Sequence, residues 1–307
     1  MHLKSLSIRS LQALMLVVFI AFSFGCRSDG SKSSGDDLNV EMNEEGDDIF
    51  NDINQAKTIF YSLPSPLETA MLIKTAGAKY NAEFLNPESN AGNYSTNKQM
   101  ALNLGVYTTD LSFASLFDQT QTSITYMQAA KKMADGLGIL EAIDNSTIER
   151  LEENVNNRDE IMNIISETFL TSSSTLQEDN RNAVASLVLV GGWVEGLYIA
   201  TQLVGDAPIK GNKIVERIVD QKLSLDIVLR LLDENKSNTD VANVITEMQE
   251  MKKVYDKIIV KTSEIVPVVD ETTKVTTLKS KTEITLTPEI FKELKETVKK
   301  IRTNFTL

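Results

Sequence analysis

Cysteine and histidine are almost missing from this chain. Among 307 residues, Cys26 is the only cysteine and His2 the only histidine. A single cysteine cannot form an intramolecular disulfide bond, so packing has to stabilise the fold. Without imidazole, Ser-His-Asp and Cys-His nucleophiles cannot operate near neutral pH. Transition-metal sites depend on imidazole and thiolate ligands, so we expect no transition metal and no cofactor.

Aromatic residues and proline are also scarce, at 6% and six residues. Alanine, leucine, isoleucine, valine, glutamate and lysine are plentiful, a composition that favours helices over a β-sandwich. The apolar content of 42% is enough to bury a core. The predicted fold class is all-α, an antiparallel multi-helix bundle.

Basic residues are outnumbered by acidic ones, 31 to 43, and the formal net charge is −12. Such a chain has little electrostatic reason to bind nucleic acid or anionic lipid headgroups. We therefore expect no nucleic-acid partner, and the excess negative charge is explained by solubility.

The N-terminus resembles a bacterial lipoprotein signal. Lys4 and Arg9 form a basic start, Leu11–Phe24 an apolar run, and Gly25 is the small residue before Cys26. On this interpretation a signal peptidase cuts before Cys26, and its thiol carries lipid such as palmitate. The mature chain would then contain no histidine.

Two details qualify this signal. A lipobox usually has an aliphatic residue three positions before the cysteine, where this chain has Ser23. The alternative is an uncleaved N-terminal anchor helix, which would also place the rest of the chain outside the cytoplasm. Arg27 replaces the aspartate that retains many lipoproteins in the inner membrane, so the outer membrane is favoured, with a periplasmic or a surface face.

The expected organisation is a signal peptide (1–25), the lipidated cysteine with an acidic tether (26–52), and a helical domain (53–307). A sub-division into 53–208 and 209–307 is possible. A calcium loop within the tether lacks the ligand spacing of an EF-hand. Apolar periodicity and capping residues predict helices at 66–78, 96–117, before 136–138, 183–204, 214–232, 241–258 and 288–305, with an extended or hairpin segment at 273–286.

Residues 183–204 are the most apolar stretch, and they contain one acid, Glu195. A membrane-spanning helix is conceivable, but a buried core helix explains the stretch better. Its small residues recur every four positions and predict close packing against a helix that carries Gly105. These small residues are Gly192, Gly196 and Ala200.

A buried Glu195 has to be paired, hydrogen-bonded or used with a raised pKa. Three basic residues are the predicted partners: Lys74, Lys98 and Arg181. Trp193 and Tyr198 lie close to Glu195 in sequence, and together the three define a possible ligand pocket. Ordinary helix packing is the alternative interpretation of both aromatic residues.

Catalytic signatures are weak. Carboxylate pairs for glycoside hydrolysis would be Asp110 with Asp118 or Glu141 with Asp144, yet their spacing does not distinguish them from other acids. The chain has no P-loop, no dinucleotide-binding glycine motif and no Ser-Lys constellation. No catalytic residue is assigned.

The segment Tyr61–Thr69 (YSLPSPLET) and the tripeptide Gly191-Gly192-Trp193, taken with the lipobox, resemble uncharacterised bacterial envelope lipoproteins. The resemblance spans about 56–205. It implies a location in the envelope and neither an activity nor site residues.

Three hypotheses follow. The first is a lipid-anchored, non-catalytic helical domain that binds an envelope protein or has a structural role, and an exposed apolar patch would favour it. The second is a small-ligand-binding lipoprotein, which needs a cavity that reaches Glu195. The third is a carboxylate-only hydrolase, which needs two facing acids in a cleft.

Overall fold

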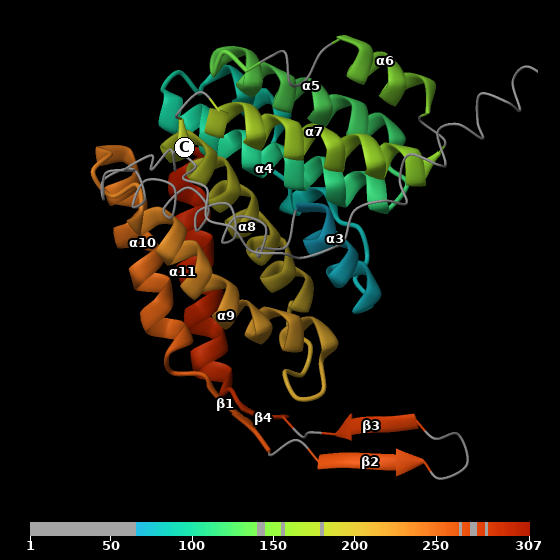
Figure 1. The fold of residues 1–307 in the computed structure, drawn as a ribbon, viewed down its shortest axis with the longest axis vertical. Coiled ribbons are helices and arrows are strands. Elements are labelled where there is room, and N and C mark those ends of the chain that lie inside the picture. Colours follow the sequence, from blue (N-terminus) through green and yellow to red (C-terminus); the bar gives the residue numbers. More distant parts are fainter. Residues whose placement is uncertain are drawn as a thin grey trace, which may run out of the picture. The chain divides into compact units, whose positions relative to one another are not determined.

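Two long helices, α4 (Asn97–Leu116) and α8 (Asn182–Val204), form the centre of the helical domain, and the other helices pack around them (Figure 1). The structure is a computed structural model, and it describes residues 66–139, 145–154, 157–178, 181–263, 266–270, 275–279 and 282–307. Within these ranges it consists of helices and a short strand ribbon. The predicted all-α class with a small extended segment near the C-terminus is confirmed.

Helix α4 begins at a capping box and is buried on every side. The Thr96 hydroxyl accepts the Gln99 N–H at 3.2 Å, and the Gln99 side chain accepts the Thr96 N–H at 3.3 Å. All residues from 101 to 116 are buried, whereas the sequence predicts a single apolar face. Buried hydroxyls are satisfied within the helix, because Thr108 and Ser112 donate to carbonyl oxygens four residues earlier.

Helix α8 is the predicted core helix. Among the described helices it is the one long and apolar enough to cross a membrane, yet 83% of its most apolar window is buried inside the domain. Its burial arises from packing against α4, α9, α11 and α3. The expected helix 183–204 is therefore confirmed in position and in its place in the core.

The backbones of α4 and α8 approach each other closely at glycines. A Cβ on Gly105 would overlap the Val188 carbonyl oxygen and the Gly192 nitrogen, and a Cβ on Gly191 would overlap the Leu102 carbonyl oxygen. The predicted contact between Gly105 and Gly192 is thus confirmed, and Gly191 is an additional contact.

The predicted strip of small residues is wrong beyond Gly192. Gly196 and Ala200 line a cavity on the side of α8 that carries Trp193. An α-helix turns by about 100° per residue, so positions 188, 191, 192 and 195 share the face toward α4, and steps of four from Gly192 drift away from it.

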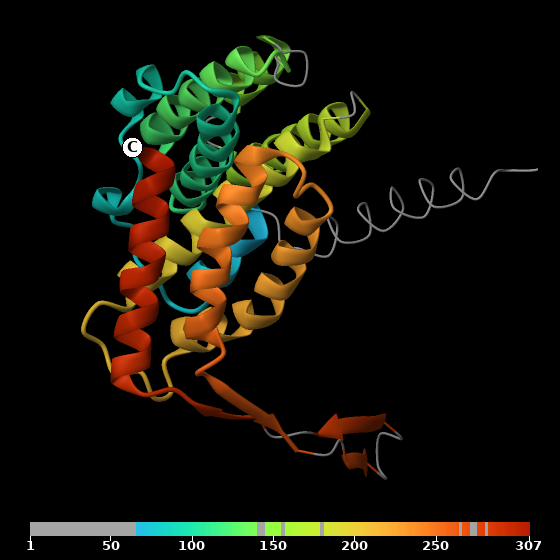
Figure 2. The same ribbon diagram turned by 90° about the vertical axis from the view of Figure 1, so that its left-hand side faces the viewer.

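The remaining helices surround this pair. Short polar turns and caps separate them, and the Asn212 and Asn238 side chains each accept two backbone N–H groups at the start of a helix. Figure 2 shows α9, α10 and α11 side by side. Their bounds are α3 (Pro66–Thr75), η1 (Ala82–Phe84), η2 (Glu88–Gly92), α5 (Thr120–Gly136), α6 (Asn145–Glu153), α7 (Arg158–Glu178), α9 (Lys213–Asp233), α10 (Thr239–Tyr255) and α11 (Pro288–Thr306).

A two-stranded antiparallel ribbon connects α10 to α11 (Figures 1 and 2). Its first ladder joins β1 (Ile259–Thr262) to β4 (Thr282–Thr285), and the second joins β2 (Val266–Asp270) to β3 (Val275–Lys279). The pairing register shifts by one residue between the ladders. The sequence predicts a helix through residue 258 and an extended segment that begins at 273. The helix instead ends at Tyr255, because the β-branched residues that follow favour a strand.

Residues 49–307 form one unit. Helix α8 packs against α9 and α11, so the possible sub-division after residue 208 is not observed. The predicted signal peptide, the lipidated Cys26 and the tether lie outside the described residues.

We predict that Gly105→Ala and Gly191→Ala each lower the free energy of unfolding by about 3 kcal/mol, because a methyl group at either site meets backbone that cannot rotate away. Gly92→Ala is the matched control, since its Cβ would meet only the end of Lys132 at 3.6 Å. Urea denaturation of the purified chain measures all three. Equal stability of the Gly105, Gly191 and Gly92 variants would contradict the close packing.

Candidate functional site

Glu195 lies on α8 with no exposed surface, and its carboxylate forms a two-pronged ion pair with Arg302 on α11. Arg302 Nε donates to Oε2 at 2.9 Å, and Nη2 donates to Oε1 at 3.1 Å. The guanidinium side chain is 13% exposed. Planar bidentate pairing matches the guanidinium geometry and compensates the cost of burying both charges.

The prediction that Glu195 is paired is confirmed, but each of its predicted partners is wrong. Lys74 donates to the Leu116 carbonyl oxygen, and Arg181 donates to the Leu137 carbonyl oxygen at 2.7 Å. Lys98 acts electrostatically on Glu247. The partner is Arg302, which lies 107 residues from Glu195 in sequence. Helix periodicity gives no information about contacts between residues so far apart in the chain.

A second carboxyl group, Asp110 on α4, is fully buried beside this pair. Its Oδ2 accepts the Asn86 backbone N–H at 3.0 Å, and no described donor reaches Oδ1. Burial raises the pKa of Asp110 well above its usual range, the Glu195 charge raises it further, and Arg302 acts in the opposite direction.

The facing acids are therefore Asp110 and Glu195, which the sequence did not pair. Asp118 is exposed at the end of α4, where its φ is 58°, and so does not accompany Asp110 in the core. The other proposed pair, Glu141 with Asp144, lies outside the described residues. The sequence did not show the pairing of Asp110 with Glu195, because these residues lie on two different helices. The point at which the two helices cross depends on Gly105 and Gly191.

Two buried asparagines and a tyrosine extend this cluster to the last turn of α11. Asn103 Nδ2 donates to the Phe305 carbonyl oxygen at 2.7 Å, and Tyr94 donates to the Thr306 carbonyl oxygen at 3.1 Å. Asn86 Nδ2 donates to Tyr94 at 3.1 Å and to Asn103 Oδ1 at 3.3 Å. The last carbonyl groups of a helix have no partner within it, so these side chains fix the end of α11.

Tyrosine rings enclose the charged groups. The Arg302 guanidinium lies over the Tyr198 ring, 4.8 Å from its centre, in cation-π geometry. Burial raises the pKa of Tyr198, Tyr107 and Tyr126, so all three phenols stay neutral near pH 7. Burial by itself lowers the pKa of Arg302, but the Glu195 carboxylate outweighs it and the pKa is raised overall.

The structure does not gather the three residues of the predicted pocket around one cavity. Trp193 lies on the opposite side of α8 from Glu195, because two residues correspond to about 200° of helix rotation. Its ring nitrogen donates to Gln221 Oε1 at 3.0 Å, and it lines a cavity with Ile73, Gly196, Leu197, Ala200, Arg217, Ile218 and Gln221. Tyr198 shares the environment of Glu195 through Arg302.

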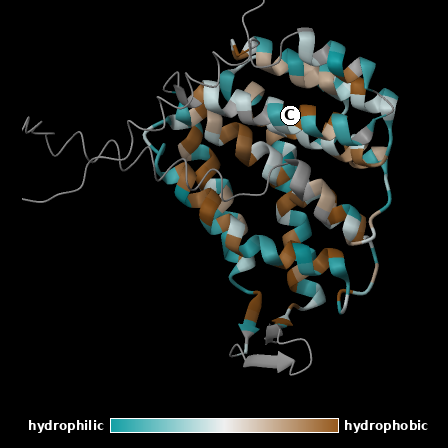
Figure 3. Ribbon diagram, turned by 45° about the vertical axis from the view of Figure 1, so that its right-hand side comes forward, coloured by the Kyte–Doolittle hydropathy of each residue, from teal (hydrophilic) through white to brown (hydrophobic). Residues whose placement is uncertain are grey.

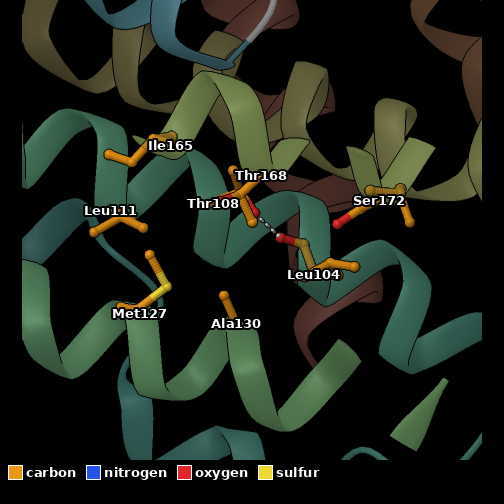
Figure 4. Close-up of a pocket in the computed structure, with 9 residues that line it drawn as sticks. Leu104, Thr108, Leu111, Met127, Ala130, Ile165, Thr168 and Ser172 are labelled. Carbon is orange, nitrogen blue, oxygen red and sulfur yellow. Dashed lines mark hydrogen bonds between the residues drawn. The ribbon is translucent and has the colours of Figure 1, made fainter. Parts of the chain in front are cut away.

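A second cavity lies between α4, α5, α7 and α8, lined mainly by apolar side chains with Thr108, Thr168 and Ser172 (Figure 4). In each of these cavities the space open to the centre of a water molecule is about 20 Å³. That is room for ordered water rather than for a drug-sized ligand.

The described residues contain no group of three or more acidic, cysteine or histidine side chains placed to hold a metal ion. The chemistry of the cluster is thus that of two carboxyl groups and one guanidinium, all but sealed from solvent. Substrate cannot reach acids that have no exposed surface, and the arrangement is suited to fixing α11 against α4 and α8.

We predict that Glu195→Gln and Arg302→Gln each destabilise the chain by about 3 to 5 kcal/mol, because each breaks a buried bidentate pair and leaves the remaining charged group without the partner to which the fold aligns it. The double variant should lose less than the sum of the two, which is the signature of direct coupling. Lys300→Gln, on the same helix as Arg302, is the control, since the ion pair of Lys300 with Glu250 on α10 is exposed and should contribute little to stability. Additive losses in urea denaturation would contradict the coupling.

The chain matches no protein-family model, no curated protein and no solved structure. The resemblance to bacterial envelope lipoproteins therefore stays a prediction from the sequence. The function has to be inferred from the residues and their geometry.

Proposed function

We propose that this chain is a lipid-anchored protein of the cell envelope whose helical domain is non-catalytic and binds another envelope protein through the β1–β4 ribbon. The observation that carries the proposal is the gathering of exposed apolar side chains on the ribbon. Ile259, Val260 and Ile284 are 49%, 42% and 38% exposed, and they account for half of the large exposed hydrophobic residues among the described side chains.

The ribbon exposes apolar surface on both of its faces. In the β1–β4 register Val260 lies opposite Ile284, so these two share one face, and Ile259 lies on the other. Figure 3 shows the hydrophobic start of β1 outside the helices. Exposed large apolar side chains that gather on one element of a folded chain are typical of an interaction site.

Within the described part of the chain, each strand of the ribbon also has one edge without a neighbouring strand, because each of the two described sheets has two strands. Unpaired backbone donors and acceptors along such an edge accept an extended segment of another protein. An isolated two-stranded hairpin is marginally stable, so an added strand would also stabilise the ribbon. Main-chain pairing and side-chain burial thus favour the same kind of partner.

Charge is consistent with this role. Residues 259–285 contain four lysines and four acidic residues, whereas the whole chain has a formal net charge of −12. A neutral ribbon can approach a second protein with less repulsion than the rest of the chain.

The other two hypotheses receive less support. Small-ligand binding needs a cavity at Glu195, but that carboxylate is occupied by Arg302, and the cavity beside Trp193 has the size of a water site. A carboxylate hydrolase needs solvent access, and Asp110 and Glu195 have none. Both acids are better explained as groups that hold helices α4, α8 and α11 together.

We predict that Cys26→Ser moves the chain from the membrane fraction to the soluble fraction and abolishes incorporation of labelled palmitate. The thiol of Cys26 is the only one in the chain, so no other site can take a thioether-linked lipid. Cells expressing the native chain and a Ser23→Ala variant serve as controls. Membrane retention of the Cys26→Ser chain would favour the uncleaved anchor helix.

We predict that a photoreactive amino acid at Val260 crosslinks one specific envelope protein in intact cells. The same probe at Leu223 on α9, which is 75% exposed, tests whether exposure alone is sufficient. Ile284→Asp should abolish the Val260 adduct while circular dichroism of the helices stays unchanged, and Leu223→Asp should leave the adduct intact. An adduct that forms equally well from Leu223, or none from Val260, would refute docking through the ribbon.

A further inference from the structure

We infer that Asp110 and Glu195 share one buried proton, so that a neutral Asp110 donates a hydrogen bond to Glu195, and that this proton keeps helix α11 latched to α4 and α8. The inference concerns the stability of the domain and is independent of the partner that the ribbon binds.

The first argument is the hydrogen-bonding balance of Asp110. Its Oδ2 is satisfied by the Asn86 N–H, but Oδ1 is buried and receives no described donor. An ionised carboxylate would leave this oxygen with an unpaired charge, which is costly in the core. A proton on Oδ1 turns the oxygen into a donor, and the carboxylate of Glu195 lies in hydrogen-bonding contact to accept it.

The second argument is the charge balance. The ionisable groups that act on Asp110 are Glu195 on α8 and Arg302 on α11, and the guanidinium is already paired with Glu195 through both of its prongs. Two carboxylates and one guanidinium would leave one net negative charge in the core. One shared proton makes the cluster neutral.

Among the residues that the structure describes, no cation other than Arg302 acts on Asp110. The further titratable groups that interact with it are phenols: Tyr80 before η1, Tyr107 on α4, Tyr126 on α5 and Tyr198 on α8. Tyr94, in the segment before α4, interacts with Glu195 and Arg302. All five have a raised pKa, so they remain neutral and cannot compensate a second carboxylate.

The third argument links the proton to α11. Asn86, which holds Asp110 Oδ2, also donates to Tyr94 and Asn103, and these two bind the carbonyl groups of Phe305 and Thr306. The carbonyl end of a helix carries partial negative charge. A second carboxylate at this place would repel the end of α11 as well as Glu195, so loss of the proton opposes docking of this helix.

The sign of the pH dependence follows from the raised pKa. In the unfolded chain Asp110 titrates at about 3.9, and in the folded chain its pKa is higher. Its contribution to stability is complete below the unfolded pKa and is lost as the pH rises toward the folded pKa. Within that window the unfolding equilibrium constant should increase up to tenfold per pH unit.

The test compares the full native chain with Asp110→Asn, which imitates the neutral acid in shape and hydrogen bonding. The free energy of unfolding is measured by urea denaturation from pH 4 to pH 9. In the native chain it should fall with rising pH by the additional amount that deprotonation of Asp110 contributes, and in Asp110→Asn this additional fall should be absent. Asp118→Asn removes an exposed acid from the end of the same helix and should follow the native profile. Superimposable profiles of the native chain and Asp110→Asn would overturn the shared proton.

Infrared spectroscopy provides a direct readout. The folded native chain at neutral pH should show the carbonyl band of a protonated carboxyl group, and Asp110→Asn should lack it. Glu195→Gln should lack it too, because Asp110 would then ionise against Arg302, so this second variant keeps the test decisive if Asp110→Asn does not fold. A native chain without the band would overturn the inference.

Amide hydrogen exchange tests the latch itself. As the pH rises, protection of α11 amides, corrected for intrinsic exchange, should fall more steeply than protection of α9 and α10 amides in the native chain. The difference should vanish in Asp110→Asn. A uniform loss of protection over all three helices would show that the proton stabilises the whole domain without latching α11.

Discussion

The contact between the backbones of α4 and α8 is the constraint on which the rest of the domain depends. Gly105 and Gly191 have no Cβ, and this lets the two helices approach until a side chain on either glycine would overlap the other helix. The approach brings Asp110 and Glu195, one from each helix, into contact in the core. Two acids that are buried side by side require a cation or a proton to balance their charge. The close packing at the two glycines therefore creates the need for a compensating charge at this place in the core.

Arg302 supplies the cation, and with it the position of α11. Buried ion pairs are weak evidence for net stability, but they penalise arrangements in which a charge is left alone. A slip of α11 by one turn would replace Arg302 at Glu195 with Val298 or Lys299, and would also remove the Phe305 and Thr306 carbonyl groups from Asn103 and Tyr94. The cluster is thus a device for specifying one register of the last helix.

The helices and the ribbon are stabilised in different ways. In the helical part, apolar side chains pack into one core, and most buried polar groups, including the hydroxyls of Thr108 and Ser112 on α4, have partners inside the chain. In the ribbon, Ile259, Val260 and Ile284 stay exposed, and each strand has one edge that no other described strand pairs with. The helical part is thus stabilised by its own contacts, whereas the ribbon leaves apolar side chains and strand edges available to a second protein. This difference is why the proposed function is assigned to the ribbon.

The sequence by itself determined the helical class, the positions of most helices, the buried place of α8 and the contact between Gly105 and Gly192, because periodicity, caps and composition act locally. It also indicated that a buried Glu195 has to be paired, hydrogen-bonded or used with a raised pKa, and pairing is the outcome. Only the tertiary structure decided the partner, since Arg302 lies 107 residues away and no local pattern distinguishes it from other basic residues. The same holds for the Asp110 and Glu195 pair and for the separation of Trp193 from Glu195, which depend on how helices cross and which face each presents. The strands from Ile259 were missed because their residues continue the apolar period of α10, and the competition between helix and strand was resolved by where that helix ends.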